Sequence, residues 1–196
     1  QSPLLRRQCA FAAMTVAEYF RDRGRSVLYI ADSITRLAEA HREVAVAAGE
    51  PPALRGHPAS MSSTITALCE RAGPGIAGQG DITAIFSVLV AGSDMEEPVA
   101  DTLRGVLDGH VVLDRDIAEA GRYPAVDVLR SVSRCLPAAA NDAENVMISR
   151  TRKLIGVYER SKTMIRAGLY TEGSDVGIDE AIQAHDDLET LLSRDE

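Results

Sequence analysis

The segment Val27-Leu28-Tyr29-Ile30-Ala31-Asp32-Ser33 is the most informative part of the sequence about the fold. Its first five residues are apolar, rich in strand formers and too few for a buried helix, so they predict a strand covered on both faces. Strands of that kind belong to parallel sheets. Asp32 and Ser33 then mark the start of a helix.

Helical patterns flank this strand on both sides. From Leu4 to Phe20 apolar residues recur at three- and four-residue steps, which predicts a helix with one buried face. That face is expected to hold Leu5, Cys9, Ala12, Ala13, Val16, Ala17 and Phe20. A second helix is expected from Asp32-Ser33 to Ala48, where Gly49 and Pro51-Pro52 end it.

Helices and strands keep alternating along the chain, which predicts the α/β pattern of a doubly wound domain. The expected elements are a helix at 62–72, a strand at 82–90, a helix at 98–107, a short strand at 110–113 and a short helix at 117–120. Beyond Pro137 strand patterns disappear, and two helical patterns follow at 143–169 and 178–192. The sequence therefore predicts one α/β domain over residues 1–137 and a small helical domain over residues 138–196.

Composition limits the functions open to the chain. A net charge of −8 and a pI near 5.1 argue against a general nucleic-acid binder, which needs a basic face. The three cysteines form no CxxC pair, which favours a reducing cytosol over a disulfide framework or a zinc site. No apolar run approaches the ~20 residues that cross a bilayer, so we expect peripheral membrane association at most. Because the sequence starts at Gln1 within a helical pattern, we expect a piece of a longer protein.

Asp32 is the first candidate for chemistry. A carboxylate at the carboxyl end of a buried parallel strand lies where α/β folds bind ligands, and in phosphate-processing sheets it orders a magnesium ion. An Asp before Ser33-Ile34 is also an ordinary helix N-cap. No GxxxxGK[ST] phosphate-binding loop occurs in the 196 residues, so the residues alone indicate only a candidate nucleotide-type domain.

A family resemblance comes from distinctive blocks that cover nearly the whole chain in order. They are Val27 to Arg36, Arg42-Glu43, Gly49 to Pro52, Gly80 to Ala84, Leu107 to His110, Ala118 to Gly121, Tyr123 to Asp127 and Ser131 to Arg134. With these blocks the chain resembles the flagellar and type III secretion export ATPases, relatives of the rotary ATP synthase β subunit. The resemblance implies a RecA-like parallel-sheet nucleotide-binding domain followed by a small all-α C-terminal domain.

The resemblance also implies roles for four residues, with ATP and Mg²⁺ as cofactors. Asp32 is similar to the Walker B aspartate that holds magnesium through water. Arg36 is similar to an arginine that reaches the same site; alternatively, it is an exposed charge in the first turn of the helix. Tyr123 is similar to the aromatic residue that packs on adenine, the alternative being a packing anchor. Arg134 is similar to the arginine finger, which enters the neighbouring subunit's site; a lone Arg in a Ser-rich loop is otherwise a solvated charge.

An arginine finger implies a ring of six subunits in which each site is shared by two neighbours. The family's phosphate-binding loop and the glutamate that activates water lie, in relatives, upstream of Gln1. Without them we expect residues 1–196 alone neither to hydrolyse ATP nor to bind it tightly. Two alternatives remain open. They are a non-catalytic ring or scaffold subunit, and the ATPase of a virulence type III secretion system instead of the flagellar one.

The helical tail is a candidate docking surface. It carries basic residues within an acidic chain, namely Arg150, Arg152, Lys153, Arg160, Lys162 and Arg166. The resemblance implies that stalk and export-gate proteins and export chaperone–substrate complexes dock there, at the cytoplasmic face of the inner membrane; a solvated helix face is the alternative. Among other polar residues, His41 is expected to be packed, Cys69 to lie in the core, and Asp94, Glu96 and Glu97 to form a solvated loop.

Overall fold

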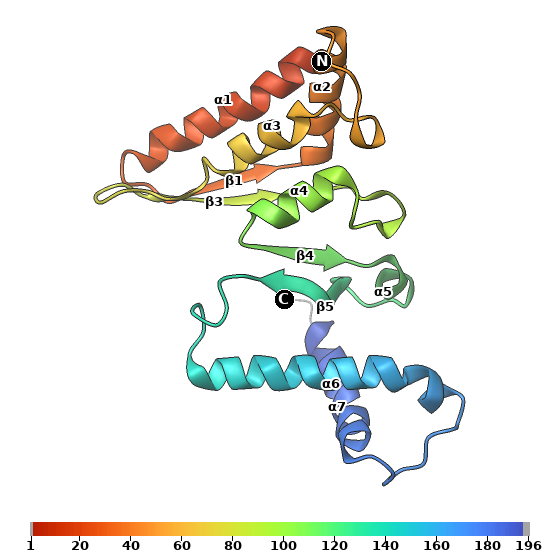
Figure 1. The fold of residues 1–196 in the computed structure, drawn as a ribbon. Coiled ribbons are helices and arrows are strands. Elements are labelled where there is room, and N and C mark those ends of the chain that lie inside the picture. The colour runs from red at the N-terminus through yellow and green to blue at the C-terminus, as the bar shows by residue number, and fades with distance from the viewer. Residues whose placement is uncertain (1, 194–196) are drawn as a thin grey trace. The chain divides into compact units, whose positions relative to one another are not determined.

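A parallel pair of strands organises the first part of the chain (Figure 1). The computed structural model describes residues 2–193, without the side chains of Leu54 and Ser93. It divides into two compact units, Gln1–Leu107 and Asp108–Glu196. No helix within the described residues is long and apolar enough to cross a membrane.

The first unit contains a three-stranded sheet and four α-helices. Its elements are α1 (Pro3–Arg21), β1 (Val27–Ala31), α2 (Ile34–Ala47), the 3-10 turn η1 (Leu54–Gly56), α3 (Ser60–Cys69), β2 (Gly73–Pro74), β3 (Asp81–Phe86), the 3-10 turn η2 (Ala91–Ser93) and α4 (Pro98–Val106). β1 pairs in parallel with β3, from Val27 opposite Ile82 to Ala31 opposite Phe86, and β2 pairs antiparallel to β3. The predicted parallel sheet is therefore confirmed, although β3 ends at Phe86 rather than at Val90.

The strand β1 is buried on one face only, which corrects the prediction that both faces are covered. Tyr29 is 7% exposed, whereas Leu28 is 59% and Ile30 is 63% exposed. Successive side chains of a strand point to opposite faces, so the alternation means that the described residues cover only the Tyr29 face. Ile85 of β3, which is paired with Ile30, is also 54% exposed.

Helix α1 forms as predicted, with Ser2 as its N-cap and Pro3 at its first position, but it buries a different face. Met14 and Ala17 are buried, whereas Val16 is 57% and Phe20 is 48% exposed. The predicted face of Leu5, Cys9, Ala12, Ala13, Val16 and Phe20 is exposed, and only Ala17 of that set is buried. Polar residues border the true inner face because they find partners there: Glu18 forms an ion pair with Arg71.

The second unit combines a two-stranded antiparallel sheet with the C-terminal helices. Its elements are β4 (Gly109–Leu113), α5 (Arg115–Glu119), β5 (Val126–Ser133), α6 (Asp142–Arg166) and α7 (Val176–Leu192). The two long helices begin and end within a few residues of the predicted ranges. The predicted domain boundary at 137/138 falls between β5 and α6, inside this compact unit, and stays a prediction.

Strand β5 is an element that the sequence pattern does not predict. Its register against β4 shifts between His110 and Val112, and the Asp127 carboxylate accepts hydrogen bonds from the backbone N–H groups of Leu129 and Arg130. Such an irregularity breaks the two-residue alternation by which a strand is found in a sequence.

Candidate functional site

Asp32 follows β1 at the carboxyl edge of the parallel pair, where ligands bind in α/β folds. Asp32 is exposed, and its Oδ1 accepts a hydrogen bond of 2.6 Å from the Ser87 hydroxyl. Its Oδ2 makes no hydrogen bond with a described residue. A carboxylate oxygen that is open to solvent suits Mg²⁺, which keeps several waters and takes one or two protein carboxylates.

Asp32 does not cap the helix that follows it. The N-cap of α2 is Ser33, and neither residue's side chain accepts a hydrogen bond from the first turn. The hydroxyl of Ser33 is buried and has no partner among the described residues. The ordinary alternative for Asp32, a helix cap, is therefore wrong, and its carboxylate lies at the edge of the sheet instead.

Backbone hydrogen bonds fix this edge on both sides of Asp32. The N–H of Ser87 donates to the Ala31 carbonyl, and the N–H of Ile34 donates to the Ser87 carbonyl, each over 3.0 Å. Two residues further on, the N–H of Leu89 donates to the Thr35 hydroxyl over 2.9 Å. The segment after β3 is therefore tied to the start of α2, although the strand itself ends at Phe86.

The other predicted residues lie in different places. Arg36, the third residue of α2, is exposed, and its guanidinium makes no hydrogen bond or ion pair with a described residue. In the second unit Tyr123 precedes β5 and is 60% exposed, so it is not a packing anchor there. Arg134 follows β5 and is exposed, and its backbone N–H donates to the Asp108 carbonyl over 2.7 Å. Asp32 thus lies just before α2 and Arg36 in its first turn, whereas Tyr123 and Arg134 lie in the second unit, and the roles of all four residues stay predictions.

A polar network that the sequence pattern does not indicate joins α2 to α3. The carboxylate of Glu50 accepts hydrogen bonds from the Ser60 N–H (2.9 Å) and the Ser60 hydroxyl (2.6 Å) at the start of α3. Because Ser60 has one hydroxyl proton and Glu50 only accepts, His41 Nε2 donates to Ser60 Oγ over 2.7 Å. The bonds from Ser60 lower the pKa of Glu50, and burial and Arg7 lower the pKa of His41.

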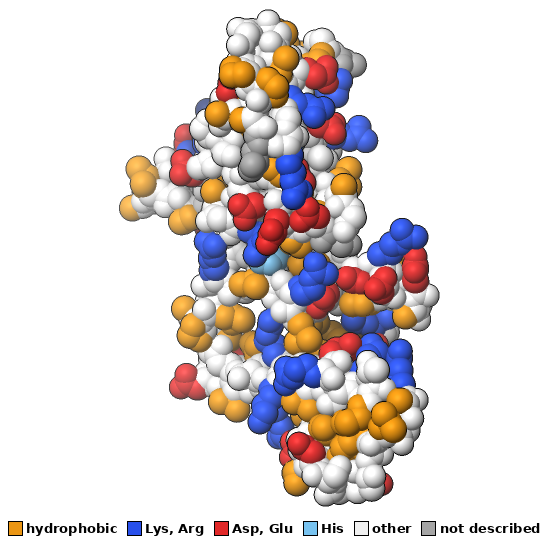
Figure 2. All heavy atoms as spheres, turned by 45° about the vertical axis from the view of Figure 1, so that its right-hand side comes forward, with side chains coloured by type: hydrophobic (Ala, Val, Ile, Leu, Met, Phe, Trp, Pro, Cys, Tyr) orange, Lys and Arg blue, Asp and Glu red, His pale blue; other side chains and the backbone are white. Residues whose placement is uncertain are grey.

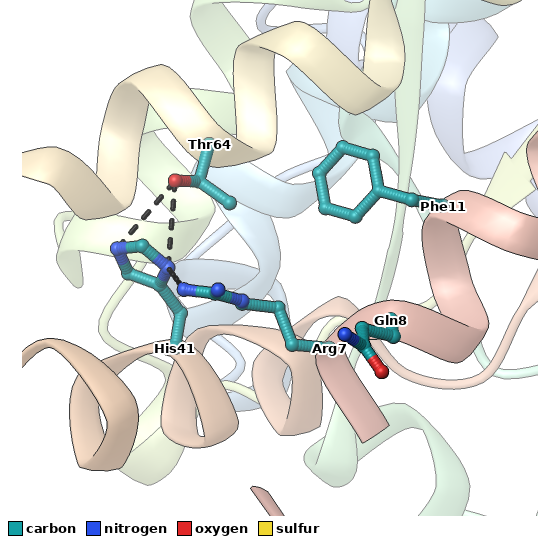
Figure 3. Close-up of a pocket in the computed structure, with 5 residues that line it drawn as sticks. All are labelled: Arg7, Gln8, Phe11, His41 and Thr64. Carbon is teal, nitrogen blue, oxygen red and sulfur yellow. Dashed lines mark hydrogen bonds between the residues drawn. The ribbon is translucent and has the colours of Figure 1, made fainter. Parts of the chain in front are cut away.

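The packed position of His41 is confirmed, because its side chain is 6% exposed. It borders a shallow pocket of about 400 Å³ between α1, α2 and α3, which is also lined by Arg7, Gln8, Phe11 and Thr64 (Figure 3). Cys69 is also buried as predicted, and burial raises the pKa of its thiol to about 11. An unreactive core thiol follows.

The acidic loop after β3 is more than a solvated connection. Asp94 forms an ion pair with Arg55, which lowers the pKa of the Asp94 carboxyl. Glu97 is the N-cap of α4 and accepts hydrogen bonds from the N–H groups of Val99 and Ala100. The sequence holds a signal for this cap, because Glu97 stands directly before Pro98 at the first helical position. Among the described residues, no group of three or more His, Cys, Asp or Glu side chains lies together to hold a metal ion.

The basic stretch of α6 separates into two kinds of residue. The guanidinium of Arg152 is partly buried and donates to the backbone carbonyls of Val128, Leu129 and Ser131 of β5. Arg152 therefore has a structural role and is not a simple solvated charge, while the docking role of the tail stays a prediction. Arg150 and Lys153 remain exposed beside a hollow of about 580 Å³ between α6 and α7. Apolar and basic side chains lie side by side over this helical region in the space-filling view (Figure 2).

Two protein families match the chain in succession. The nucleotide-binding domain of the ATP synthase alpha/beta family matches residues 1–133, and the C-terminal domain of the type III secretion ATPase EscN matches residues 140–196. The chain thus belongs to the ATP synthase alpha/beta family, in the branch that carries the EscN-type C-terminal domain. The predicted RecA-like fold with a helical C-terminal region is confirmed.

Similar curated proteins include flagellar ones. The flagellum-specific ATP synthase of Salmonella typhimurium is 46% identical over 98% of this chain, and that of Helicobacter pylori is 44% identical over all of it. The chain covers 42% and 45% of their lengths, so it spans less than half of these relatives.

Similar solved structures include ATPases of type III secretion systems. The assembled ATPase EscN of enteropathogenic E. coli superimposes with a TM-score of 0.92 at 40% identity, over 98% of this chain and 46% of that one. EscN in complex with its central stalk EscO gives a TM-score of 0.89 at 39% identity, over 99% of this chain and 46% of that one. The resemblance inferred from the sequence is therefore confirmed at the level of family and fold.

Proposed function

We propose that the chain is part of a ring-forming ATPase that energises bacterial flagellar protein export, in the cytoplasm at the inner membrane. The observation that carries this proposal is the carboxylate of Asp32, which stands at the carboxyl edge of the parallel strands and does not cap α2. The names of the curated relatives favour the flagellar branch over the virulence branch, although the similar solved structures come from the latter.

In this proposal Asp32 holds Mg²⁺ through water beside the terminal phosphate of ATP, and Arg36 reaches the same site from the first turn of α2. Tyr123, whose ring is mostly exposed, packs on adenine. A magnesium ion held there would neutralise charge on the phosphates. No residue of this chain forms the phosphate-binding loop, so residues 1–196 alone are expected to be inactive.

Arg134 is proposed to act in the site of a neighbouring subunit. EscN is described as an assembled ATPase, and a hexameric ring of this protein would place an arginine after β5 at each subunit boundary. Arginine fingers contribute about 10³–10⁵ in rate. The proposed partners are a stalk protein, as EscN has in EscO, export-gate proteins and export chaperone–substrate complexes, docking on the C-terminal helices.

The test is ATP turnover by a full-length protein that contains this chain, over concentrations that span assembly. Arg134→Ala is expected to stay assembled and to lose at least about a hundredfold in kcat. Arg115→Ala is the matched control, because the Arg115 side chain is 83% exposed in the same unit and pairs with Glu119 along α5. Unchanged turnover of assembled Arg134→Ala would contradict the finger assignment. A wild-type protein without turnover at any concentration would favour a scaffold subunit.

A further inference from the structure

Ser87 is held beside Asp32 by the register of the two parallel strands. Ala31, the last residue of β1, lies opposite Phe86, the last residue of β3, so Asp32 and Ser87, which follow the two strands, lie at the same edge of the sheet. The Ser87 hydroxyl is 2.6 Å from Asp32 Oδ1, although the two residues are 55 positions apart. The contact is therefore created by the sheet and is not a local turn.

The direction of this hydrogen bond is fixed by chemistry. A serine hydroxyl has one proton, and an ionised carboxylate can only accept, so Ser87 donates to Asp32. Hydrogen bonds to a charged acceptor are shorter and stronger than neutral ones, and 2.6 Å lies in their range. One carboxylate oxygen is thereby engaged, and the other, Oδ2, faces no described partner.

The backbone of Ser87 is fixed as well. Its N–H donates to the Ala31 carbonyl and its carbonyl accepts from the Ile34 N–H, so the main chain is bonded on both sides of Asp32. Ser33 gives the contrast: it is next to Asp32 in sequence, yet its buried hydroxyl has no partner among the described residues. Of these two hydroxyls, only that of Ser87 forms a hydrogen bond with the carboxylate.

We propose that Ser87 is a positioning residue, which holds the Asp32 carboxylate in the one orientation that presents Oδ2 to the Mg²⁺ of the nucleotide. This inference rests on the proposed function of Asp32. Mg²⁺ demands near-ideal octahedral geometry, so a carboxylate that rotates freely binds its water shell less well. Outer-shell hydrogen bonds of this kind are worth roughly 10–100-fold in metal affinity or activity.

The experiment compares Ser87→Ala, which removes the hydroxyl, with Ser87→Thr, which keeps it, in a full-length protein that contains this chain. Binding of Mn²⁺ in the presence of ADP is measured by electron paramagnetic resonance, and ATP turnover is measured as a function of Mg²⁺. Ser87→Ala is expected to weaken Mn²⁺ binding about tenfold or more and to raise the Mg²⁺ concentration for half-maximal turnover similarly. Ser87→Thr should restore both. Ser63→Ala is the control, because the Ser63 hydroxyl is exposed and bonds only within α3.

Two further variants separate this inference from the function on which it rests. Asp32→Asn should abolish the metal response, and adding Ser87→Ala to it should cause no further loss, because the two residues act as one unit. If Asp32→Asn abolishes the response but Ser87→Ala binds Mn²⁺ like the wild type, the role of Ser87 is refuted, even if its thermal unfolding midpoint falls. If Asp32→Asn itself behaves like the wild type, the proposed function of Asp32 fails first, and the inference falls with it.

Discussion

The two compact units are stabilised internally by different interactions. The first unit, Gln1–Leu107, contains the connected hydrophobic core, with Ile65, Leu68 and Val99 at 0–1% exposure. In the second unit only two described hydrophobic residues are buried, Val112 and Ala181. There polar and ring contacts join the elements: the Arg152 guanidinium binds the carbonyls of β5, and the ring of Tyr158 in α6 stacks on that of His185 in α7.

The comparison teaches that burial stabilises the unit that carries Asp32, whereas directed hydrogen bonds stabilise the unit that carries Arg134. Apolar residues of the second unit stay on its surface, including Val146 at 70%, Val176 at 73% and Leu169 at 76% exposure. Stabilisation by burial scales with the apolar area removed from water and tolerates small shifts in side-chain position. A hydrogen bond is lost altogether when one partner is removed. Substitutions should therefore act on the two units in different ways.

The largest effect is expected from a cavity in the first unit. Leu68→Ala removes a side chain with 0% exposure from the core and should lower the free energy of unfolding by about 2–5 kcal/mol. Leu191→Ala, in the second unit, removes a side chain that is 57% exposed and should change it by less than about 0.5 kcal/mol. Urea unfolding followed by circular dichroism measures both. Equal losses would contradict the assignment of the core to the first unit.

A smaller effect is expected from removal of the Arg152 guanidinium. Arg152→Ala leaves the carbonyls of Val128, Leu129 and Ser131 without this donor and should destabilise the second unit by about 1–3 kcal/mol. Amide hydrogen exchange should show faster opening of β5 and α6 and no change in the first unit. Arg150→Ala on the same helix is the control, because Arg150 is exposed. If both variants exchange alike, Arg152 does not hold β5.

The smallest effect is expected from protonation of His41 in the first unit. Burial and Arg7 hold the pKa of His41 below its ordinary value, while Glu50 opposes them. His41 therefore takes up a proton near pH 6.5 in the unfolded chain but only at lower pH in the folded chain. The free energy of unfolding should fall as the pH drops from about 7 to below about 6.5. His41→Gln should flatten this dependence in urea unfolding at several pH values. A wild-type protein whose stability is constant over that interval would contradict the assignment.

The region around His41 also shows why hydrogen bonds between distant residues cannot be predicted from the sequence. The block Gly49-Glu50-Pro51-Pro52 indicates only the family, yet Glu50 binds the start of α3 through Ser60, ten residues away. The position of Asp32 at the end of a strand follows from local patterns, but its partner Ser87 does not. A contact across 55 residues depends on which strands become neighbours, and no pattern within β1 carries that information.

Local sequence patterns predict the positions of helices and strands better than they predict which face of a helix is buried. The strand β1, the helix α2 and the two long C-terminal helices follow from apolar periodicity and from turn residues that act within a few positions of the chain. The exposed stripe of α1 shows the limit of the same method. Val16 and Phe20 have the right spacing for a buried face, yet both are exposed. The opposite face of α1 packs inward instead, because Glu18 on that side forms an ion pair with Arg71.

The parallel sheet, the family and four candidate residues could be predicted from the sequence, because short-range spacing and distinctive blocks are properties of the chain. Three further points required the folded structure: Asp32 does not cap a helix, Ser87 donates a hydrogen bond to its carboxylate, and Arg152 binds the carbonyls of β5. Each of these depends on atoms that are distant along the chain and are brought within hydrogen-bond distance by strand register and helix packing.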